Sequence, residues 1–271
     1  FFAGPMRRDI LNRPGPSSYG LDDLVGGGVT HYLQLLFTYI LYLFQMVTRN
    51  WGLAIILLTV LVRLCMHPLT KKSQVAMHHM QELQPRMKEL QEKHKNDKQK
   101  LQQETMKLQK EAGFPMFKGC LPMFFQLPIF IALWWSLRTN IFLRGAYLLP
   151  PSVGWLDDLS QPDRLYMFSQ PVSILFLTIY EINLLPILMV AAMVVQQQMQ
   201  PKSSNPEQAQ QQKVMAVMMS LIFLFFFYTM PSGLTLYFLI STSWGIVEGR
   251  IIRKHIDELK SKKALYGKAD S

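Results

Sequence analysis

One arginine constrains this chain more than any other residue, because it interrupts an apolar run long enough to enter a membrane. The run covers residues 51–66 (WGLAIILLTVLVRLCM) and contains Arg63. An ionisable side chain at membrane depth is costly unless it faces a polar or hydrated interior, so it marks a functional site by default. Steps of four residues place Thr59, Arg63 and His67 on one helical face. The sequence therefore predicts a membrane helix with one polar side.

The alternative explanation for Arg63 is that its long aliphatic stem carries the guanidinium out to the lipid headgroups. At 1.5 Å per residue, Arg63 lies roughly 18 Å along the helix from Trp51 and about 12 Å before Lys71. Lys71 and Lys72 already anchor that end of the helix. A second cation deeper in the apolar run is poorly explained as an anchor, which favours a polar cavity.

Four further apolar stretches follow, and hydrophobic residues make up 49% of the chain. With its flanks, each stretch reaches or approaches the ~20 residues that a spanning helix needs. Lys and Arg number 28 against 18 Asp and Glu, a mixture that fits a membrane protein with basic loops on one side. We therefore predict an all-α integral membrane protein with five core transmembrane helices. The four stretches cover residues 121–137, 184–195, 214–230 and 234–247.

Positive charge is distributed unequally between the segments that connect these helices. Of the Lys and Arg outside the predicted spans, 20 lie in three segments and 7 lie in the remaining connecting segments. The three basic segments are 70–118, 196–213 and the tail from residue 250. The positive-inside rule then places the basic set and the C-terminus in the cytoplasm, and the N-terminus of this chain outside. The net charge of +10 is mainly topological, although basic segments also attract anionic lipid or ribosomal RNA.

The N-terminal part divides into two predicted pieces. Residues 1–30 are rich in Pro, Gly and Ser and are expected to form an irregular external segment; the absence of a recognisable signal peptide is typical of a mature fragment. Residues 31–47 are apolar and aromatic. A membrane crossing there would need a tight turn at 48–50 and would spoil the charge asymmetry, so we predict an interfacial helix on the outer leaflet.

Residues 70–112 switch to a composition of Gln, Lys, Glu and Met, with apolar residues at steps of three, four or seven. This pattern predicts two amphipathic helices folded as an antiparallel cytoplasmic hairpin, with a break at Asn96-Asp97 and a kink at Pro85. A solvated hairpin that only spaces two spans fits the pattern as well as a binding surface does. The apolar positions are Met80, Leu83, Met87, Leu90, Leu101 and Leu108.

The outer loop between the second and third spans contains the apolar, β-branched stretch 171–180. It is too short for a span, and Glu181, Asn183 and Pro186 follow it closely. We interpret it as an outer-leaflet element that precedes the third span.

The sequence gives no sign of enzymatic chemistry. The five predicted spans contain no Asp and no HExxH motif, so they lack the paired aspartates or the metal motif that an intramembrane protease would need. His67, His78 and His79 lack acidic or thiolate partners beyond Cys65, so no metal site is predicted. Cys65 and Cys120 lie near the same cytoplasmic boundary, where a disulfide is not expected. No cofactor is implied.

The motifs together identify a family. NWGLAIILLTVLVR and PLTKKS are followed by GCLPMFFQLPIFIALWW, LPILM and MPSGLTLYF. From residue 48 to 253 the chain resembles the YidC/Oxa/Alb family of membrane protein insertases, its bacterial members most closely. The resemblance implies a five-span core at 48–253 around a hydrophilic groove, open to cytoplasm and lipid and closed outside, in the bacterial inner membrane. The stretch 171–180 is longer than expected, and the N-terminal span and large periplasmic domain of Gram-negative members do not precede this core.

The resemblance also implies residues and partners. Arg63 takes the place of the groove arginine, Thr59 shares its face, and Gln126 is the polar residue of the QLPIF motif. The implied partners are nascent membrane proteins, the lipid bilayer and a Sec translocon. The basic tail 254–271 and the residue before it are predicted to contact ribosomes or anionic lipid. The residues of that patch are Arg253, Lys254, Lys260, Lys262 and Lys263.

A small-solute or anion channel is the alternative function from another class. One buried arginine in a groove would suit the passage of an anion. Five spans without an inverted repeat give that alternative little support.

Overall fold

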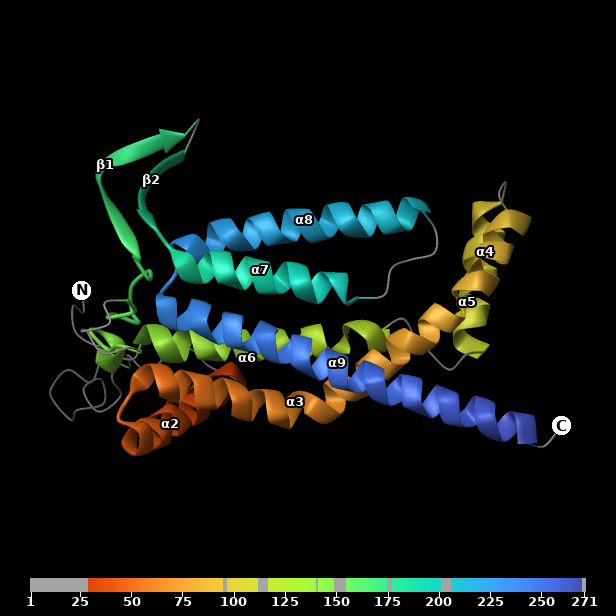
Figure 1. The fold of residues 1–271 in the computed structure, drawn as a ribbon, viewed down its shortest axis with the longest axis horizontal. Coiled ribbons are helices and arrows are strands. Elements are labelled where there is room, and N and C mark those ends of the chain that lie inside the picture. Colours follow the sequence, from red (N-terminus) through yellow and green to blue (C-terminus); the bar gives the residue numbers. More distant parts are fainter. Residues whose placement is uncertain are drawn as a thin grey trace, which may run out of the picture. The chain divides into compact units, whose positions relative to one another are not determined.

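The protein is seen in a computed structural model that describes residues 29–94, 97–111, 117–139, 141–148, 155–174, 177–200 and 206–269. Most of these residues are helical (Figure 1). Nearly all of the predicted external segment 1–30 lies outside them. The helices are α2 (Val29–Thr48), α3 (Trp51–Glu82), α4 (Gln84–Lys93), α5 (Lys98–Glu111), α6 (Phe117–Thr139), α7 (Leu184–Gln198), α8 (Pro206–Tyr228) and α9 (Ser232–Ala269), and the strands are β1 (Tyr166–Ile174) and β2 (Leu177–Ile182).

The five predicted spans fall on helices α3, α6, α7, α8 and α9, the fourth running two residues past the end of α8. Among the described residues, two helical segments are long and apolar enough to cross a bilayer, Trp51–Met77 and Ala209–Tyr228. Two shorter apolar helical segments are Phe124–Leu137 and Leu184–Gln198. The predominantly helical fold is thus confirmed, while the number of crossings stays a prediction.

The expectation of an all-α chain is wrong at the outer loop, where β1 and β2 form an antiparallel hairpin (Figure 1). Tyr166 pairs with Ile182 and Ile174 pairs with Leu177, and the register shifts between Met167 and Val172. The stretch contains β-branched residues, which suit a strand. Pro171, which has no N–H to donate, lies in the part of β1 where the pairing with β2 is irregular. The predicted outer-leaflet element at 171–180 is therefore part of a β-hairpin.

The chain divides into two compact units. Unit 1 consists of Phe1–Val62, Phe125–Ala191 and Phe223–Ser241. Unit 2 consists of Arg63–Phe124, Ala192–Ile222 and Thr242–Ser271. The predicted polar face of α3 is shared between them, since Thr59 belongs to unit 1 and Arg63 and His67 belong to unit 2.

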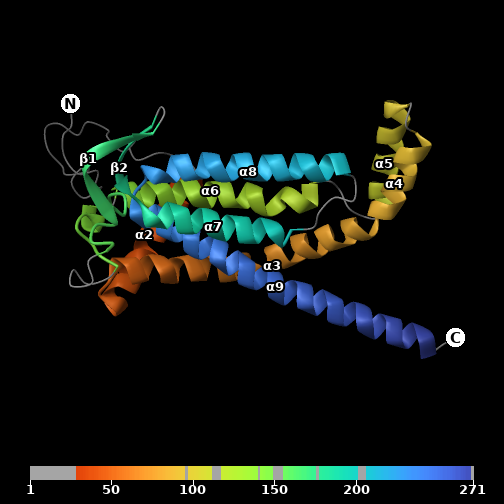
Figure 2. The same ribbon diagram turned by 45° about the horizontal axis from the view of Figure 1, so that its top comes forward.

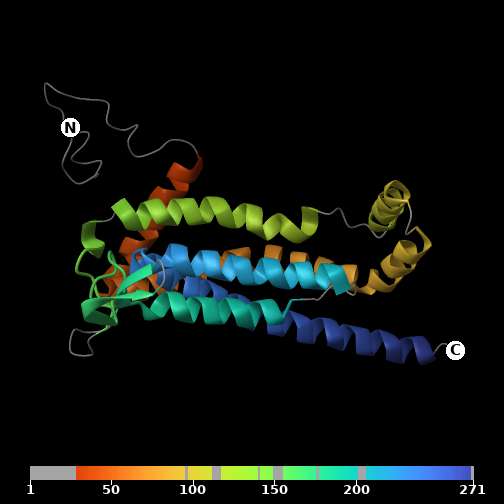
Figure 3. The same ribbon diagram turned by 90° about the horizontal axis from the view of Figure 1, so that it is seen from above.

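In unit 1, helix α2 packs with one face and exposes the other. Phe37 and Leu41 are buried, and Thr38 Oγ1 lies 2.8 Å from Ser136 Oγ of α6, which α2 crosses obliquely (Figure 3). Large apolar side chains cover the opposite face, as an interfacial helix requires. The helix therefore carries apolar side chains on its exposed face as well as on its packed face, and its position at the outer leaflet stays a prediction. The exposed residues include Tyr32, Leu36, Tyr39, Met46 and Val47.

In unit 2, helices α4 and α5 lie side by side as two arms (Figure 2). Helix α3 ends at Glu82, and α4 begins at Gln84 with Pro85 in its first turn, the position where proline is tolerated. Asp97 Oδ1 accepts the N–H of Lys100 at 3.1 Å and so caps the start of α5. The predicted apolar positions whose side chains are described are half-buried: Leu83, Met87, Leu90, Leu101 and Leu108. The side chain of Met80 lies outside the described part.

The predicted boundary between core and tail at residue 253 falls inside α9, which is one helix of 38 residues from Ser232 to Ala269, and the division itself stays a prediction. The sequence after Arg253 contains no proline and is rich in Lys, Leu and Ala, which are good helix formers. The basic segment therefore continues the last helix.

Candidate functional site

Arg63 lies in the middle of α3 and is half-buried. The flanking Leu61 and Leu64 are 37% and 53% exposed. In this turn of α3 the two leucine side chains are therefore exposed, while the arginine side chain is partly buried. The polar face expected from the sequence stays a prediction.

The other two predicted groove residues, both in unit 1, are engaged within the protein. Thr59 is fully buried, and its Oγ1 donates to the carbonyl of Ile55 at 2.7 Å, which satisfies the hydroxyl proton inside its own helix. Gln126 of α6 is half-buried, and its Nε2 donates to Tyr237 Oη of α9 at 3.1 Å. Sequence reasoning missed Tyr237, although the MPSGLTLYF motif placed its phenol in an apolar run.

His67, the third member of the polar face, contacts an acidic residue that sequence reasoning also missed. His67 Nδ1 lies 2.6 Å from Glu248 Oε1 of α9, and the side chain of Glu248 is only 2% exposed. The predicted last span stopped at Val247, one residue short of this carboxylate. An isolated acid directly after an apolar run was the available signal.

Two residues of the predicted ribosome or lipid patch have described side chains, and the patch itself stays a prediction. Arg253 is half-buried, and its guanidinium donates to the carbonyl of Met199 at the end of α7. This contact lies within unit 2. Lys254 is exposed, as a contact residue requires. The side chains of Lys260, Lys262 and Lys263 lie outside the described part.

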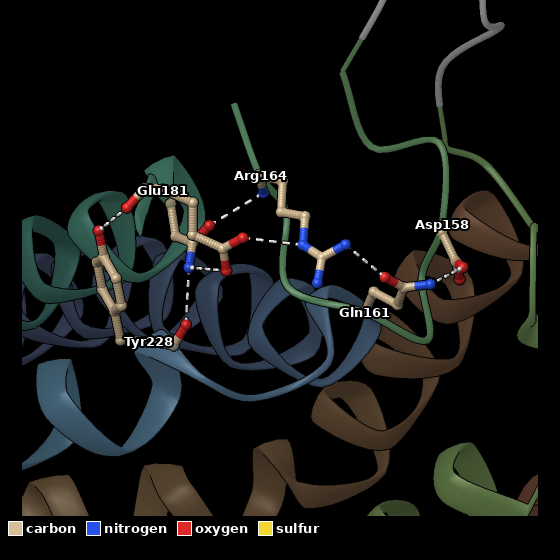
Figure 4. Close-up of polar contacts among 6 residues, drawn as sticks. Asp158, Gln161, Arg164, Glu181 and Tyr228 are labelled. Atoms are coloured by element: carbon tan, nitrogen blue, oxygen red, sulfur yellow. Dashed lines mark hydrogen bonds and ion pairs between the residues drawn. The ribbon is translucent and has the colours of Figure 1, made fainter. Parts of the chain in front are cut away.

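A polar network in unit 1 joins the loop before β1 to the end of β2 (Figure 4). Arg164 Nε lies 2.9 Å from Glu181 Oε2, and Arg164 Nη1 donates to Gln161 Oε1 at 2.7 Å. Gln161 Nε2 donates in turn to Asp158 Oδ2 at 2.9 Å. Burial raises the pKa of Asp158, but hydrogen bonds from Ser160, Gly145 and Gln161 outweigh it and leave the pKa below its usual value.

Asn183 is the buried centre of this network and is itself fully inaccessible. Its Nδ2 donates to the carbonyl of Tyr228 at 2.8 Å, and its Oδ1 accepts the N–H of Arg164 at 3.0 Å. Tyr228 Oη donates to the carbonyl of Glu181 at 2.6 Å (Figure 4). These bonds tie the hairpin to the end of α8.

The same end of unit 1 includes the starts of α7 and α9. Asp163 Oδ2 accepts the N–H groups of Leu184 and Leu185 at 2.6 and 2.8 Å, which caps α7. Burial raises the pKa of Asp163, and these N–H bonds only partly offset it. The N–H of Ser232 donates to the carbonyl of Gln161 at 2.7 Å, so the α8–α9 turn packs on the same loop.

Asn183→Ala should lower the free energy of unfolding by about 1–3 kcal/mol, because it removes a fully buried amide together with its part-buried bonds to the N–H of Arg164 and the carbonyl of Tyr228. Thermal unfolding of the purified protein in detergent measures this. Gln161→Ala is the matched control, since Gln161 is an exposed member of the same network. Equal losses for the two variants would show that burial of the amide is not what matters.

Comparison with known proteins identifies the family. A family profile described as 60Kd inner membrane protein matches residues 42–260. The chain belongs to this family. The prediction of the YidC/Oxa/Alb family is thereby confirmed, and a place in the bacterial inner membrane agrees with the family description.

Curated relatives from the 60Kd inner membrane protein family carry the name membrane protein insertase YidC. The protein of Treponema denticola is 36% identical over 262 residues, which cover 93% of this chain and 44% of that relative. The protein of Chlamydia muridarum is 35% identical over 272 residues, which cover 95% of this chain and 34% of that relative. The chain thus spans less than half the length of either relative.

A solved structure is also similar to this chain. It is described as an active YidC insertase crystal structure with the first transmembrane domain resolved. It aligns with a TM-score of 0.57 and 27% identity over 82% of this chain and 46% of that chain.

Proposed function

We propose that this chain is the membrane-embedded core of an insertase that inserts nascent membrane proteins and helps them fold. The observation that carries the proposal is the half-buried Arg63 in the apolar helix α3, in a family whose curated relatives are named insertases. The function needs no cofactor and no chemical step. Arg63 is the residue we assign to the substrate path, while Thr59 and Gln126 stay predictions from the family resemblance.

The mechanism follows from the cost of moving polar groups through hydrocarbon. A substrate carries a hydrophilic flank whose backbone groups would be unsatisfied in the bilayer core. A hydrated groove shortens the apolar path, and the guanidinium of Arg63 attracts acidic groups on the flank. The apolar helix of the substrate then moves into lipid, driven by its own burial.

The topology and partners that go with this proposal rest on the sequence. We propose five crossings on α3, α6, α7, α8 and α9, with the α4–α5 hairpin and the C-terminus in the cytoplasm. The excess of Lys and Arg in those segments supports this orientation. We also propose that α2 lies at the outer leaflet, and that the partners include ribosomes and a Sec translocon.

Reconstitution tests the proposed function. The purified chain in proteoliposomes is given a small single-span substrate, and the substrate's N-terminal flank is probed with protease. Protection of the flank is expected. An unprotected flank combined with an anion leak from the same vesicles would contradict the insertase and favour the channel.

Neutralising the basic end of α9 should weaken ribosome binding and its salt dependence while short substrates still insert. The variant changes Lys254, Lys260, Lys262 and Lys263 to Gln, which retains the helix and the Arg253 contact. Each lost phosphate contact should reduce the slope of log affinity against log salt by up to about 1. Co-sedimentation with ribosomes at several salt concentrations measures the slope.

The matched control changes the same four lysines to Arg and so preserves the charge. It should keep the slope. An unchanged slope in the Gln variant would refute ribosome binding by this patch, and loss of insertion in that variant would refute a role limited to recruitment.

A further inference from the structure

We infer that Glu248 is a positioning residue: through its bond to His67 it sets the rotation of α3 and so directs Arg63 toward the substrate path. The inference rests on the proposed insertase function. The residues involved, His67, Arg63 and Glu248, all lie in unit 2.

The contact joins two helices that are far apart in the sequence. His67 on α3 and Glu248 on α9 are 181 residues apart, and the two side chains meet at 2.6 Å. A carboxylate can only accept, so Nδ1 carries the proton of this contact when Glu248 is ionised. His67 is one turn after Arg63 and on the same helical face. Fixing His67 against α9 therefore fixes the direction in which Arg63 points from α3.

Burial of the Glu248 carboxylate costs free energy, so its presence on α9 needs an explanation. Glu248 is 4% exposed, and its Oε2 is buried and has no hydrogen-bond partner among the described residues. A buried polar atom without a partner is expensive. Its partner His67 has a side chain that is 45% exposed, so the imidazole is the accessible half of the pair.

A buried carboxylate held by a single partner is weak support for stability, and the best attested use of such buried polar contacts is to fix register between packed elements. The surroundings of Glu248 fit that use, because the helices come close here. A Cβ added at Gly245 would lie 2.6 Å from Gln196 Nε2 of α7, and one at Gly249 would lie 3.9 Å from Gln74 Nε2 of α3. Gly245 thus lets α7 approach α9 closely, whereas the position of Gly249 leaves room for a Cβ beside α3. Packing with that room does not by itself specify the rotation of α3. The His67–Glu248 bond specifies it.

Two matched substrates separate positioning from stability. They are single-span proteins that differ only in whether the N-terminal flank is acidic or neutral, and they are inserted into proteoliposomes containing the full chain. Glu248→Ala is expected to reduce insertion of the acidic-flank substrate by about fivefold, within the range for coupled neighbours, with little change for the neutral one. Glu248→Gln keeps the acceptor for His67 and should restore most of the activity. Arg250→Gln removes an exposed charge from the same helix and is the control.

A double-mutant cycle supplies the sharper result. In an Arg63→Ala background, Glu248→Ala should add no further loss, because the residue it positions is gone. Additive losses, or equal losses for both substrates, would overturn the inference. If Glu248→Ala does not fold, the double variant His67→Phe with Glu248→Leu replaces the pair by apolar packing, and it should keep thermal stability while losing the selectivity for acidic flanks. Retained selectivity there would also overturn the inference.

A measurement independent of insertion distinguishes failure of this inference from failure of the proposed function. Arg63→Cys is made in a chain in which Cys65 and Cys120 are changed to Ser, and its labelling rate by a polar thiol reagent is measured. Adding Glu248→Ala should change that labelling rate at least about threefold, because rotation of α3 changes the exposure of the thiol at position 63. An unchanged rate would overturn the inference even if insertion works. A wild-type chain that inserts neither substrate would instead refute the proposed function.

Discussion

Arg63→Ala is expected to reduce insertion of substrates with acidic flanks by about thirtyfold and to change insertion of neutral-flank substrates far less. Two unit charges about 7 Å apart at an effective dielectric constant near 20 attract by roughly 2 kcal/mol, which corresponds to that factor. Arg63→Lys should keep much of the activity, because it keeps the charge. Protease protection in proteoliposomes, with the two flanks compared side by side, measures the effect.

Lys71→Ala is the matched control for Arg63. It removes a charge of the same sign from the same helix, two turns later at an exposed position. We expect it to have little influence on either substrate, since an exposed charge is screened. Equal loss for neutral and acidic flanks in Arg63→Ala would assign the arginine a structural role.

Gly52→Ala should destabilise unit 1 by about 1–3 kcal/mol or more, the range for forced overpacking. A Cβ at Gly52 would lie 2.4 Å from Leu148 Cδ1 and 2.8 Å from Leu148 Cα. The backbone of Leu148 cannot move aside easily. Asn50 Nδ2 donates to its carbonyl at 3.0 Å, and its own N–H donates to the carbonyl of Leu156 at 3.0 Å. Thermal unfolding in detergent, followed by intrinsic fluorescence, measures the loss.

Gly249→Ala is the matched control, because it makes the same change in another helix with room for it. The nearest atom to a Cβ there is Met199 Cε at 3.7 Å, an ordinary contact. Relief of the glycine entropy cost should make this variant neutral or more stable by up to about 1 kcal/mol. A similar loss of thermal stability in both variants would mean that helix propensity or sample preparation, rather than the Leu148 contact, determines the result.

The outer hairpin shows where sequence reasoning lost accuracy. A short apolar run such as 171–180 fits a strand or a buried helical segment equally well, and periodicity alone cannot separate them. The pairing of β1 with β2 decides it, and the bonds of Asn183 and Arg164 fix that pairing to the rest of unit 1. None of these bonds has a signature in the spacing of the sequence.

The helical structure of the basic end of the chain was not predicted, for a different reason. Charge patterning indicates that a segment is polar but does not say whether it is helical, so the sequence did not show that the predicted tail continues α9 to Ala269. Arg253 was grouped with the lysines by charge, whereas its contact with the Met199 carbonyl depends on how α7 and α9 pack.

The sequence by itself determined the helical stretches and the family and singled out Arg63 as a candidate, because apolar length, charge asymmetry and an ionisable residue in an apolar run are local properties of the chain. Only the tertiary structure decided which polar side chains are already engaged. The contacts of Gln126 with Tyr237 and of His67 with Glu248 join residues more than a hundred positions apart. Such pairs form where packed helices desolvate two polar groups together, and that depends on helix rotation, which no local pattern encodes.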